Sequence, residues 1–328
     1  MIESEFISLL RGLATHPAAR GLRDDAAVLN IADSMQLVLT HDMLVEGVHY
    51  LPDDPPGTVA WKLVAVNMSD LAAKGAQPLG VLMGFAMTGD NEWELAFLDG
   101  LREALAVFDV PLLGGDTVSM PAYAPRSLGL TAIGSAQSAS VPSRTAARPG
   151  DRVFVSGTIG DAGAGLALLQ GRITTADETA RAALIDAYRR PRPDLQLGQK
   201  LAPLVHAMAD ISDGLLIDAS RIAEASNCAI HIALEAVPLS LAYEIAEGKA
   251  LDARLRAACA GDDYCLLFTA RSEACQALIQ TAKECGGTVA EVGQVSSGTG
   301  LSLSWNGGAI PLPERLGHQH GEKRHQAP

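Results

Sequence analysis

Acidic residues recur beside glycine, or at the ends of apolar runs, along this 328-residue chain. The carboxylates in this setting are Asp24, Asp25, Asp42, Asp70, Asp116, Asp210, Asp213, Asp262 and Asp263. Mg2+ prefers oxygen ligands and is commonly held by a few carboxylates together with substrate phosphates. Glycines such as Gly114 and Gly115 allow the backbone to approach a ligand closely and turn N–H groups toward phosphate oxygens. The pattern predicts a site for Mg2+ and a phosphorylated substrate.

Each of these positions also has a simpler interpretation. Asp70 is placed for an ion pair with Lys74 one helical turn later, and Asp42 suits a turn after a strand. The sequence "SDG" at 212–214 suits a helix cap. Taken singly these readings are preferable, but the repetition of the same setting along one chain favours the metal site.

The common nucleotide-binding signatures are absent from the sequence. It contains no GxxxxGK[ST], no GxGxxG opening a helix after a strand, and no protein-kinase catalytic-loop pattern. The histidines define no Ser-His-Asp or Cys-His arrangement by spacing alone. The residues by themselves therefore lead no further than a metal and phosphate site built from carboxylates.

Composition excludes several classes of partner. The formal net charge of −13 argues against broad attraction to nucleic acid or to an anionic membrane. No window holds about 20 uninterrupted apolar residues, and the acidic start "MIESEFISLL" is unlike a secretory signal. Five cysteines without CxxC spacing predict reduced thiols. We expect a cytoplasmic protein that binds neither nucleic acid nor membrane.

Helical and strand-like patterns alternate, which predicts a mixed α/β fold of two domains. Helical spacing runs from Ile2 to Leu13, further helices are expected at 59–76 and 92–109, and strands at 36–40, 79–87 and 127–134. The polar, proline-containing stretch 138–151 predicts the domain boundary. We expect an N-terminal domain at 1–137, a linker at 138–150 and a C-terminal α/β domain at 151–328. In the second domain "RVFVSG", "HAMADIS" and "YCLLFTA" are strand-like, while "GTIGDAGAGLALL" and "DGLLIDASRIAEA" lead into helices.

An ordered set of motifs spans nearly the whole chain and resembles the thiamine-monophosphate kinase family. The motifs are "DDAAVL", "THDMLVEGVHY", "AVNMSDLAAKGAQP", "LLGGDT", "RPGD", "SGTIGDAGAGLALL", "RPRPDLQLGQKLA", "DISDGLLID" and "GDDYCLLF". This family is related to aminoimidazole ribonucleotide synthetase and selenophosphate synthetase, whose ATP sites are built from aspartates and glycines. The resemblance implies Mg2+-dependent transfer of a phosphoryl group from ATP to thiamine monophosphate, giving thiamine diphosphate. It also implies a homodimer in which the N-terminal sheets pair into a barrel, with the C-terminal domain closing over the nucleotide.

The resemblance assigns roles position by position. Metal ligands or their near neighbours would be Asp25, Thr40, Asp42, Asp70, Asp116, Asp210 and Asp213. Nucleotide contacts would be Gly115, Asp116, Arg144 and Ser212, while His49 and Asp262 would face the thiamine phosphate. No residue is expected to act as a covalent nucleophile or general base. The simpler readings are a solvated linker cation for Arg144 and a satisfied strand-end histidine for His49.

The sequence departs from the family pattern at several positions, and two other functions stay open. Arg23, His41 and Cys265 stand where glycine, threonine and glutamate are usual, and "GHQHGE" from Gly317 replaces an aromatic-bearing segment. One alternative is another ATP-using member of the superfamily. A selenophosphate synthetase would carry a reactive N-terminal cysteine, yet no cysteine precedes Cys228, and a hydrogenase-maturation relative would end in a functional cysteine. The other alternative is a non-catalytic nucleotide- or metal-binding regulator.

Overall fold

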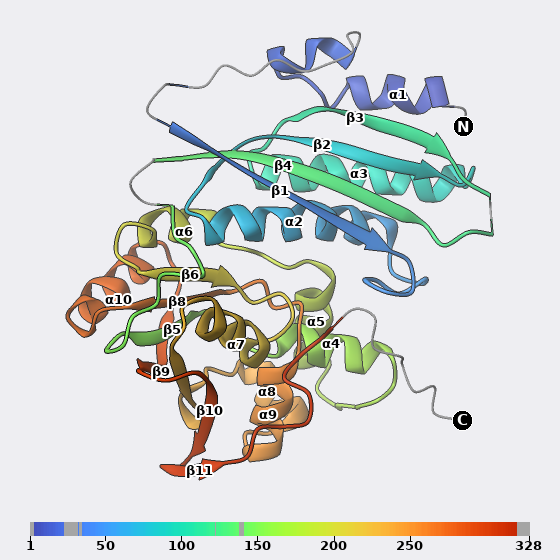
Figure 1. Ribbon diagram of the computed structural model, residues 1–328. Helices are drawn as coiled ribbons and strands as arrows, with labels where there is room; N and C mark the ends of the chain where they lie inside the picture. Colours follow the sequence, from blue (N-terminus) through green and yellow to red (C-terminus); the bar gives the residue numbers. More distant parts are fainter. Residues whose placement is uncertain (1–2, 23–31, 33–34, 122, 138–140, 320–328) are drawn as a thin grey trace. The chain divides into compact units, whose positions relative to one another are not determined.

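The computed structural model describes residues 3–22, 32, 35–121, 123–137 and 141–319 (Figure 1). The chain divides into two compact units, each described separately below. The first comprises Met1–Pro142 and Arg189–Pro203, and the second Ser143–Tyr188 and Leu204–Pro328. The first boundary falls inside the stretch expected to be a linker. The sequence-based division made 151–328 one continuous domain, whereas the structure returns residues 189–203 to the first unit.

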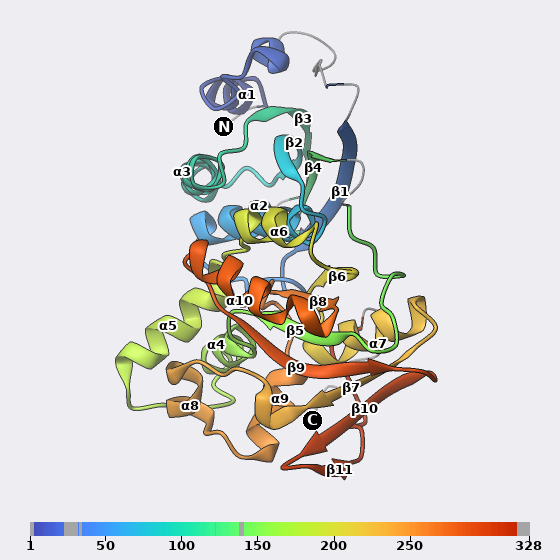
Figure 2. The ribbon, with the colours of Figure 1, turned by 90° about the vertical axis from the view of Figure 1, so that its left-hand side faces the viewer.

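The first unit is a four-stranded sheet covered on one face by two helices. Its strands, in spatial order, are β1 (Met35–Val45), β4 (Ser127–Gln137), β2 (Gln77–Met87) and β3 (Leu112–Ser119). β4 is antiparallel to β1 and to β2, and β3 is parallel to β2. The helices α2 (Pro56–Ala73) and α3 (Asn91–Val107) lie on one side of the sheet (Figure 2). Over the described residues this sheet is open, and α1 (Glu3–Arg11) and the short helix η1 (Pro17–Leu22) complete the unit.

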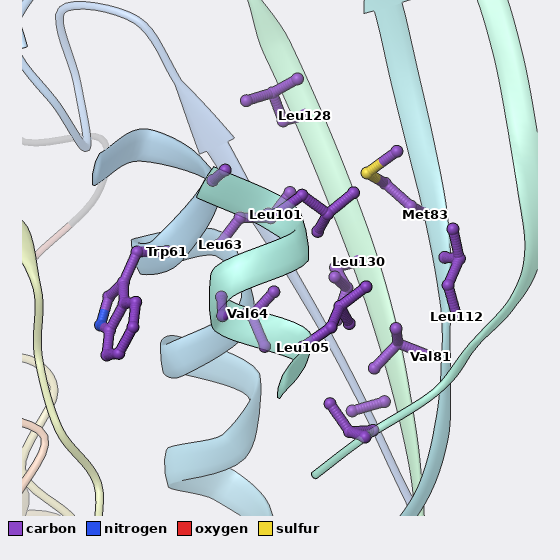
Figure 3. Close-up of a cluster of buried hydrophobic side chains, with 14 of the residues drawn as sticks. Trp61, Leu63, Val64, Val81, Met83, Leu101, Leu105, Leu112, Leu128 and Leu130 are labelled. Atoms are coloured by element: carbon purple, nitrogen blue, oxygen red, sulfur yellow. The ribbon is translucent and has the colours of Figure 1, made fainter. Parts of the chain in front are cut away.

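The core of the first unit fills the space between this sheet and the two helices. In Figure 3, side chains of α2, α3 and three strands converge there, among them Leu63, Leu101, Met83, Leu112 and Leu130. Most of α2 is buried because it packs against the sheet, against α3 and against α6 (Leu195–Leu201). This close packing depends on Gly198, where a Cβ atom would lie 2.1 Å from the carbonyl oxygen of Ala72.

The two faces of the sheet differ in the exposure of their side chains, as strand β1 shows. Successive residues of a strand point to opposite faces, so Thr40, Asp42 and Leu44 share one face. Leu44 is buried and identifies this face as the one toward the helices. Leu39 and Met43 lie on the other face and are 65% and 50% exposed. In the described part of the first unit, the second face of the sheet therefore carries exposed apolar side chains.

The second unit is built on a seven-stranded mixed sheet. The strands, in spatial order, are β11 (Gly308–Ile310), β10 (Gly300–Trp305), β7 (Ala229–Ala233), β9 (Val289–Ser296), β5 (Arg152–Ser156), β8 (Leu266–Ala270) and β6 (Ala207–Asp210). β10 and β7 are parallel and the other neighbouring pairs are antiparallel. The helices are α4 (Asp161–Leu169), α5 (Glu178–Arg189), α7 (Leu215–Ala225), α8 (Leu241–Glu247), α9 (Leu251–Cys259) and α10 (Cys275–Glu284). Short helical turns, η2 (Leu234–Ala236) and η3 (Ser272–Ala274), lie between them. The strands expected around 152–156, 207–210 and 266–270 are confirmed.

In the described part of the chain, no helix combines the length and the apolar character that crossing a bilayer requires.

Candidate active site

In the first unit, one carboxylate site joins strand β1 to helix α2. The hydroxyl of Thr40 donates a hydrogen bond to Oδ2 of Asp70. The backbone N–H of Asp42 donates to Oδ1 of Asn67 at 3.2 Å, and Asn67 in turn donates to the carbonyl of Leu63 at 3.0 Å. Thr40 and Asp42 alternate correctly to face α2, while Asn67 and Asp70 lie one helical turn apart. The structure therefore brings three of the predicted metal-site residues, Thr40, Asp42 and Asp70, to one place.

Asp116 lies elsewhere in the same unit. It is on β3, opposite Gly84 of β2, and is exposed. β4 and β2 separate β3 from β1, a separation of about 14 Å at the usual strand spacing. Gly115 next to it has φ +153°, and a Cβ there would lie 1.9 Å from the carbonyl oxygen of Met83. Within one chain Asp116 is thus apart from Thr40, Asp42 and Asp70, and Asp25 lies outside the described residues.

His49 lies in the loop that follows β1. Its Nδ1 accepts a hydrogen bond from the backbone N–H of Val45 at 3.0 Å. A ring nitrogen that accepts an N–H carries no proton, so in the neutral ring the proton is on Nε2. The carbonyl of His49 accepts from Nζ of Lys62 at 3.1 Å, although Lys62 is only 2% exposed. The Nδ1 atom of His49 is therefore hydrogen-bonded at the strand end. The protonated Nε2 is a donor that can bind a phosphate oxygen.

Two arginines hold the same loop at its ends through ion pairs. Near its start, Arg126 bonds Glu46 at 3.0 Å and Asp90 at 2.9 Å. Near its end, the buried Asp54 accepts from the N–H of Leu51 and pairs with Arg189 at 2.7 Å. Sequence reasoning did not identify these residues or Lys62. The one signal for Lys62 was a lysine inside the otherwise apolar run "AWKLVAV".

In the second unit, Arg144 and Asp210 lie side by side. Asp210 ends strand β6, is buried, and has its Oδ1 4.0 Å from Nη2 of Arg144. The carbonyl of Arg144 accepts from Oγ of Ser226 at 2.8 Å, which fixes the arginine backbone. The structure thus places the guanidinium of Arg144, which is 41% exposed, near a predicted metal-site residue, and its role as a nucleotide contact stays a prediction.

Asp213 belongs to a charged network at the start of α7. Nη1 of Arg221 lies 2.6 Å from Oδ2 of Asp213 and 2.8 Å from Oδ1 of Asp218. The N–H of Asp213 donates to Asp218 at 3.2 Å. Burial raises the pKa of Asp218, and the hydrogen bond from Arg221 opposes that rise. One carboxylate oxygen of Asp213 is therefore held by a guanidinium, and its role as a metal ligand stays a prediction.

Asp262 lies against the loop that carries Ser212. Its backbone N–H donates to the carbonyl of Ser212 at 2.8 Å, and its Oδ1 accepts from the hydroxyl of Tyr264 at 3.1 Å. The C-terminal segment reaches the same region, because the N–H of His318 donates to the carbonyl of Asp213 at 2.9 Å. The structure therefore brings Asp210, Ser212, Asp213 and Asp262 into one neighbourhood of the second unit.

The glycine-rich stretch before α4 is occupied by the chain's own carboxylates. The N–H groups of Gly160 and Ala162 donate to Asp263, at 2.7 and 3.4 Å. Asp161 accepts from the hydroxyls of Thr158 at 2.7 Å and Ser240 at 2.6 Å. Burial raises the pKa of both carboxyls. These amide groups are thus used within the fold.

The predicted metal-site residues of both units are aspartates and a threonine, which offer the oxygen ligands that Mg2+ prefers. Over the residues that the structure describes, no three His, Cys, Asp or Glu side chains are grouped closely enough to enclose a metal ion.

Comparison with known proteins gives the class of this architecture. The family "AIR synthase related protein, N-terminal domain" matches residues 23–136, and "AIR synthase related protein, C-terminal domain" matches residues 148–306. The chain is an AIR synthase related protein.

Individual relatives show to which family within this class the chain belongs. A thiamine-monophosphate kinase of Caulobacter vibrioides is 39% identical over 319 residues, covering 95% of this chain and 89% of the relative. The crystal structure of thiamine-monophosphate kinase from Stenotrophomonas maltophilia K279a is 35% identical, with TM-score 0.81, covering 92% of this chain and 95% of that one. A structure described as AaThiL complexed with AMPPCP and TMP is 30% identical, with TM-score 0.74, and covers 97% of each chain. The chain belongs to the thiamine-monophosphate kinase family, as its motifs predicted.

Proposed function

We propose that this protein transfers a phosphoryl group from ATP to the phosphate of thiamine monophosphate, giving thiamine diphosphate. The observation that carries the proposal is the likeness, over 97% of both chains, to a structure described as a complex with AMPPCP and TMP. The 39% identity to a named thiamine-monophosphate kinase across 95% of the chain supports the same reaction.

The residues present fit Mg2+ as the metal of this reaction. In the first unit, Mg2+ would be held by Thr40, Asp42 and Asp70, with Asp25 and Asp116 as further ligands. In the second unit, the proposed Mg2+ ligands are Asp210 and Asp213. Mg2+ usually binds a few carboxylates and completes its coordination with phosphate oxygens and water. When bound, it would neutralise charge on the phosphates, which repel one another strongly.

The protein's own groups then have binding and orienting tasks. Arg144 offers two parallel N–H donors to phosphate oxygens, and Gly115, Asp116 and Ser212 are the other proposed nucleotide contacts. Nε2 of His49 would donate to the acceptor phosphate, and Asp262 is the other proposed contact of the thiamine phosphate. A phosphate monoester has a second pKa of about 6, so the attacking oxygen is already largely ionised at neutral pH. We therefore propose direct in-line transfer without a general base or a phosphorylated residue.

The exposed apolar side chains on the sheet of the first unit support a homodimer. Leu37, Leu39, Met43 and Val118 are 44–65% exposed on this sheet. A face of this kind is normally covered by another surface, and pairing two such sheets around a two-fold axis would close them into a barrel. We propose that the N-terminal unit both dimerises and binds ATP and metal. We also propose a cytoplasmic location, with which the five free thiols agree.

The reaction is tested by incubating the protein with thiamine monophosphate and Mg-ATP and separating the products by chromatography. We expect thiamine diphosphate and ADP in equal amounts, and no turnover when EDTA removes the divalent cation. Free thiamine is the control, because it has no acceptor phosphate to be positioned. Equal rates with thiamine and its monophosphate would contradict the proposal, as would ADP release without thiamine diphosphate.

A further inference from the structure

The loop Gly261–Tyr264 contains two non-glycine residues in the left-handed backbone region. Asp262 has φ +71° and Tyr264 has φ +51°. Residues with a Cβ adopt this conformation reluctantly, and bulky ones least of all. Such a conformation persists where the surrounding structure over-determines it, and it is concentrated at functional sites. The contacts around this loop must therefore fix its backbone.

Backbone contacts hold one side of the loop. The N–H of Asp262 donates to the carbonyl of Ser212, and the N–H of Tyr264 to the carbonyl of Ile211, both at 2.8 Å. At Gly261 a Cβ would lie 2.6 Å from the carbonyl oxygen of Ser212, so the chain approaches as closely as glycine permits. These contacts place Asp262 next to the segment that follows strand β6.

One side chain holds the other side of the loop. The carboxylate of Asp263 accepts the N–H groups of Gly160 and Ala162, which belong to the first turn of α4 and lie about a hundred positions earlier in the chain. A carboxylate at a helix N-terminus satisfies otherwise unpaired amides and interacts favourably with the helix dipole. The loop is thus fixed between α4 on one side and the Ile211–Ser212 backbone on the other.

We propose that Asp263 is a positioning residue for the acceptor phosphate: by anchoring the loop to α4, it holds Asp262 in its left-handed conformation beside Ser212. This inference rests on the proposed function, in which Asp262 faces the thiamine phosphate. Without the anchor, the loop relaxes toward ordinary backbone conformations, and the Asp262 carboxylate leaves its place. Both oxygens of Asp263 accept hydrogen bonds from the Gly160 and Ala162 amides, so its proposed role is to position the loop.

The kinetic test compares Asp263→Ala and Asp263→Asn with the wild type. We expect Asp263→Ala to raise KM for thiamine monophosphate about tenfold while kcat stays within about threefold. Asp263→Asn keeps one oxygen that accepts the Gly160 N–H, so its KM should be intermediate. Asp161→Asn is the matched control. It alters a buried carboxylate at the same helix end, bonded to Thr158 and Ser240, and should leave KM unchanged.

A second measurement does not depend on activity. Hydrogen exchange at the Asp262 and Tyr264 amides should be faster in Asp263→Ala, and unchanged in Asp161→Asn, because both amides are hydrogen-bonded only while the loop is anchored. If Asp263→Ala does not fold, Asp263→Asn provides both measurements. Unchanged exchange refutes the anchoring, and faster exchange with unchanged KM refutes the positioning role. Absence of turnover by the wild type would refute the proposed function, while the exchange rates still decide whether Asp263 anchors the loop.

Discussion

Replacing Asp70 with asparagine separates its proposed catalytic task from its structural one. Asparagine has the same shape, and its amide oxygen still accepts the hydrogen bond from the Thr40 hydroxyl. A hydrogen bond to a charged group contributes about 1.5–3 kcal/mol and a neutral one about 0.5–1.5, so the expected loss of stability is about 1 kcal/mol. In a domain of 150–250 residues this corresponds to a fall in Tm of about 2–4 °C.

The expected loss of activity is much larger. If Asp70 is a ligand of Mg2+, the neutral amide binds the cation far less well, and we expect kcat to fall at least about a hundredfold. Such a fall corresponds to about 2.7 kcal/mol of transition-state stabilisation. The assay is thiamine diphosphate formation at saturating substrates, with Tm measured on the same preparation. Asp99→Asn is the matched control, because Asp99 is exposed on α3 and pairs only at the surface with Arg102.

Two results would refute this reasoning. A kcat within about threefold of wild type would mean that Asp70 serves only to bond Thr40. A Tm loss well beyond about 4 °C would mean that the charge itself stabilises the fold, so that the kinetic loss reports misfolding.

Three further predictions concern the groups around the site. Lys62→Met removes the hydrogen bond that Nζ donates to the His49 carbonyl, so we expect the unfolding free energy to fall by about 1–3 kcal/mol and KM for thiamine monophosphate to rise. The exposed Lys200→Met is the control, and equal effects of both variants would contradict the prediction. Gly115→Ala should destabilise the first unit strongly, since its Cβ would lie 1.9 Å from Met83 O, whereas Gly84→Ala meets nothing nearer than 3.8 Å; similar melting of the two would be the contrary outcome. Burial raises the pKa of Asp161 above its ordinary value of 3.8, so its ionisation opposes folding, and that cost disappears as the pH falls through the folded pKa. The difference Tm(wild type) − Tm(Asp161→Asn) should therefore become more positive on lowering the pH from about 7 toward 4, and a constant difference would show that Asp161 does not titrate there.

Local sequence signals predicted the elements well where neighbouring residues decide the structure. A helix was expected at 92–109, and the structure has α3 there, with the side chain of Asp90 accepting from the N–H of Trp93 at its start. A helix was also expected at 59–76, and Gly75, with φ +60°, lies just beyond the end of α2. In both cases the deciding contacts lie within a few residues along the chain.

Contacts between distant residues were not predictable in the same way. Asp262 and Asp263 look equivalent in "GDDY", yet Asp263 bonds the start of α4 and Asp262 bonds Tyr264. The ion pair between Asp54 and Arg189 joins residues 135 positions apart. Motif resemblance assigned Thr40, Asp42 and Asp70 to the metal site in one set with Asp116. It did not show that Asp116 lies on the far strand of the sheet, because strand order depends on the whole fold.

The return of residues 189–203 to the first unit has a consequence for biosynthesis. Helix α6 packs on α2 through Gly198, and the indole N–H of Trp61 donates to the carbonyl of Pro191 at 2.8 Å. A nascent chain that has emerged only to residue 150 lacks these partners, and the apolar surface of α2 that they cover is still open to water. Domains usually fold in order as they leave the ribosome. Here the first unit cannot be completed until residues 143–188 of the second unit, and then residues 189–203, have been synthesised. Translation speed through residues 143–203 should therefore influence the yield of folded protein, and fragments cut near residue 150 should need chaperones to stay dispersed.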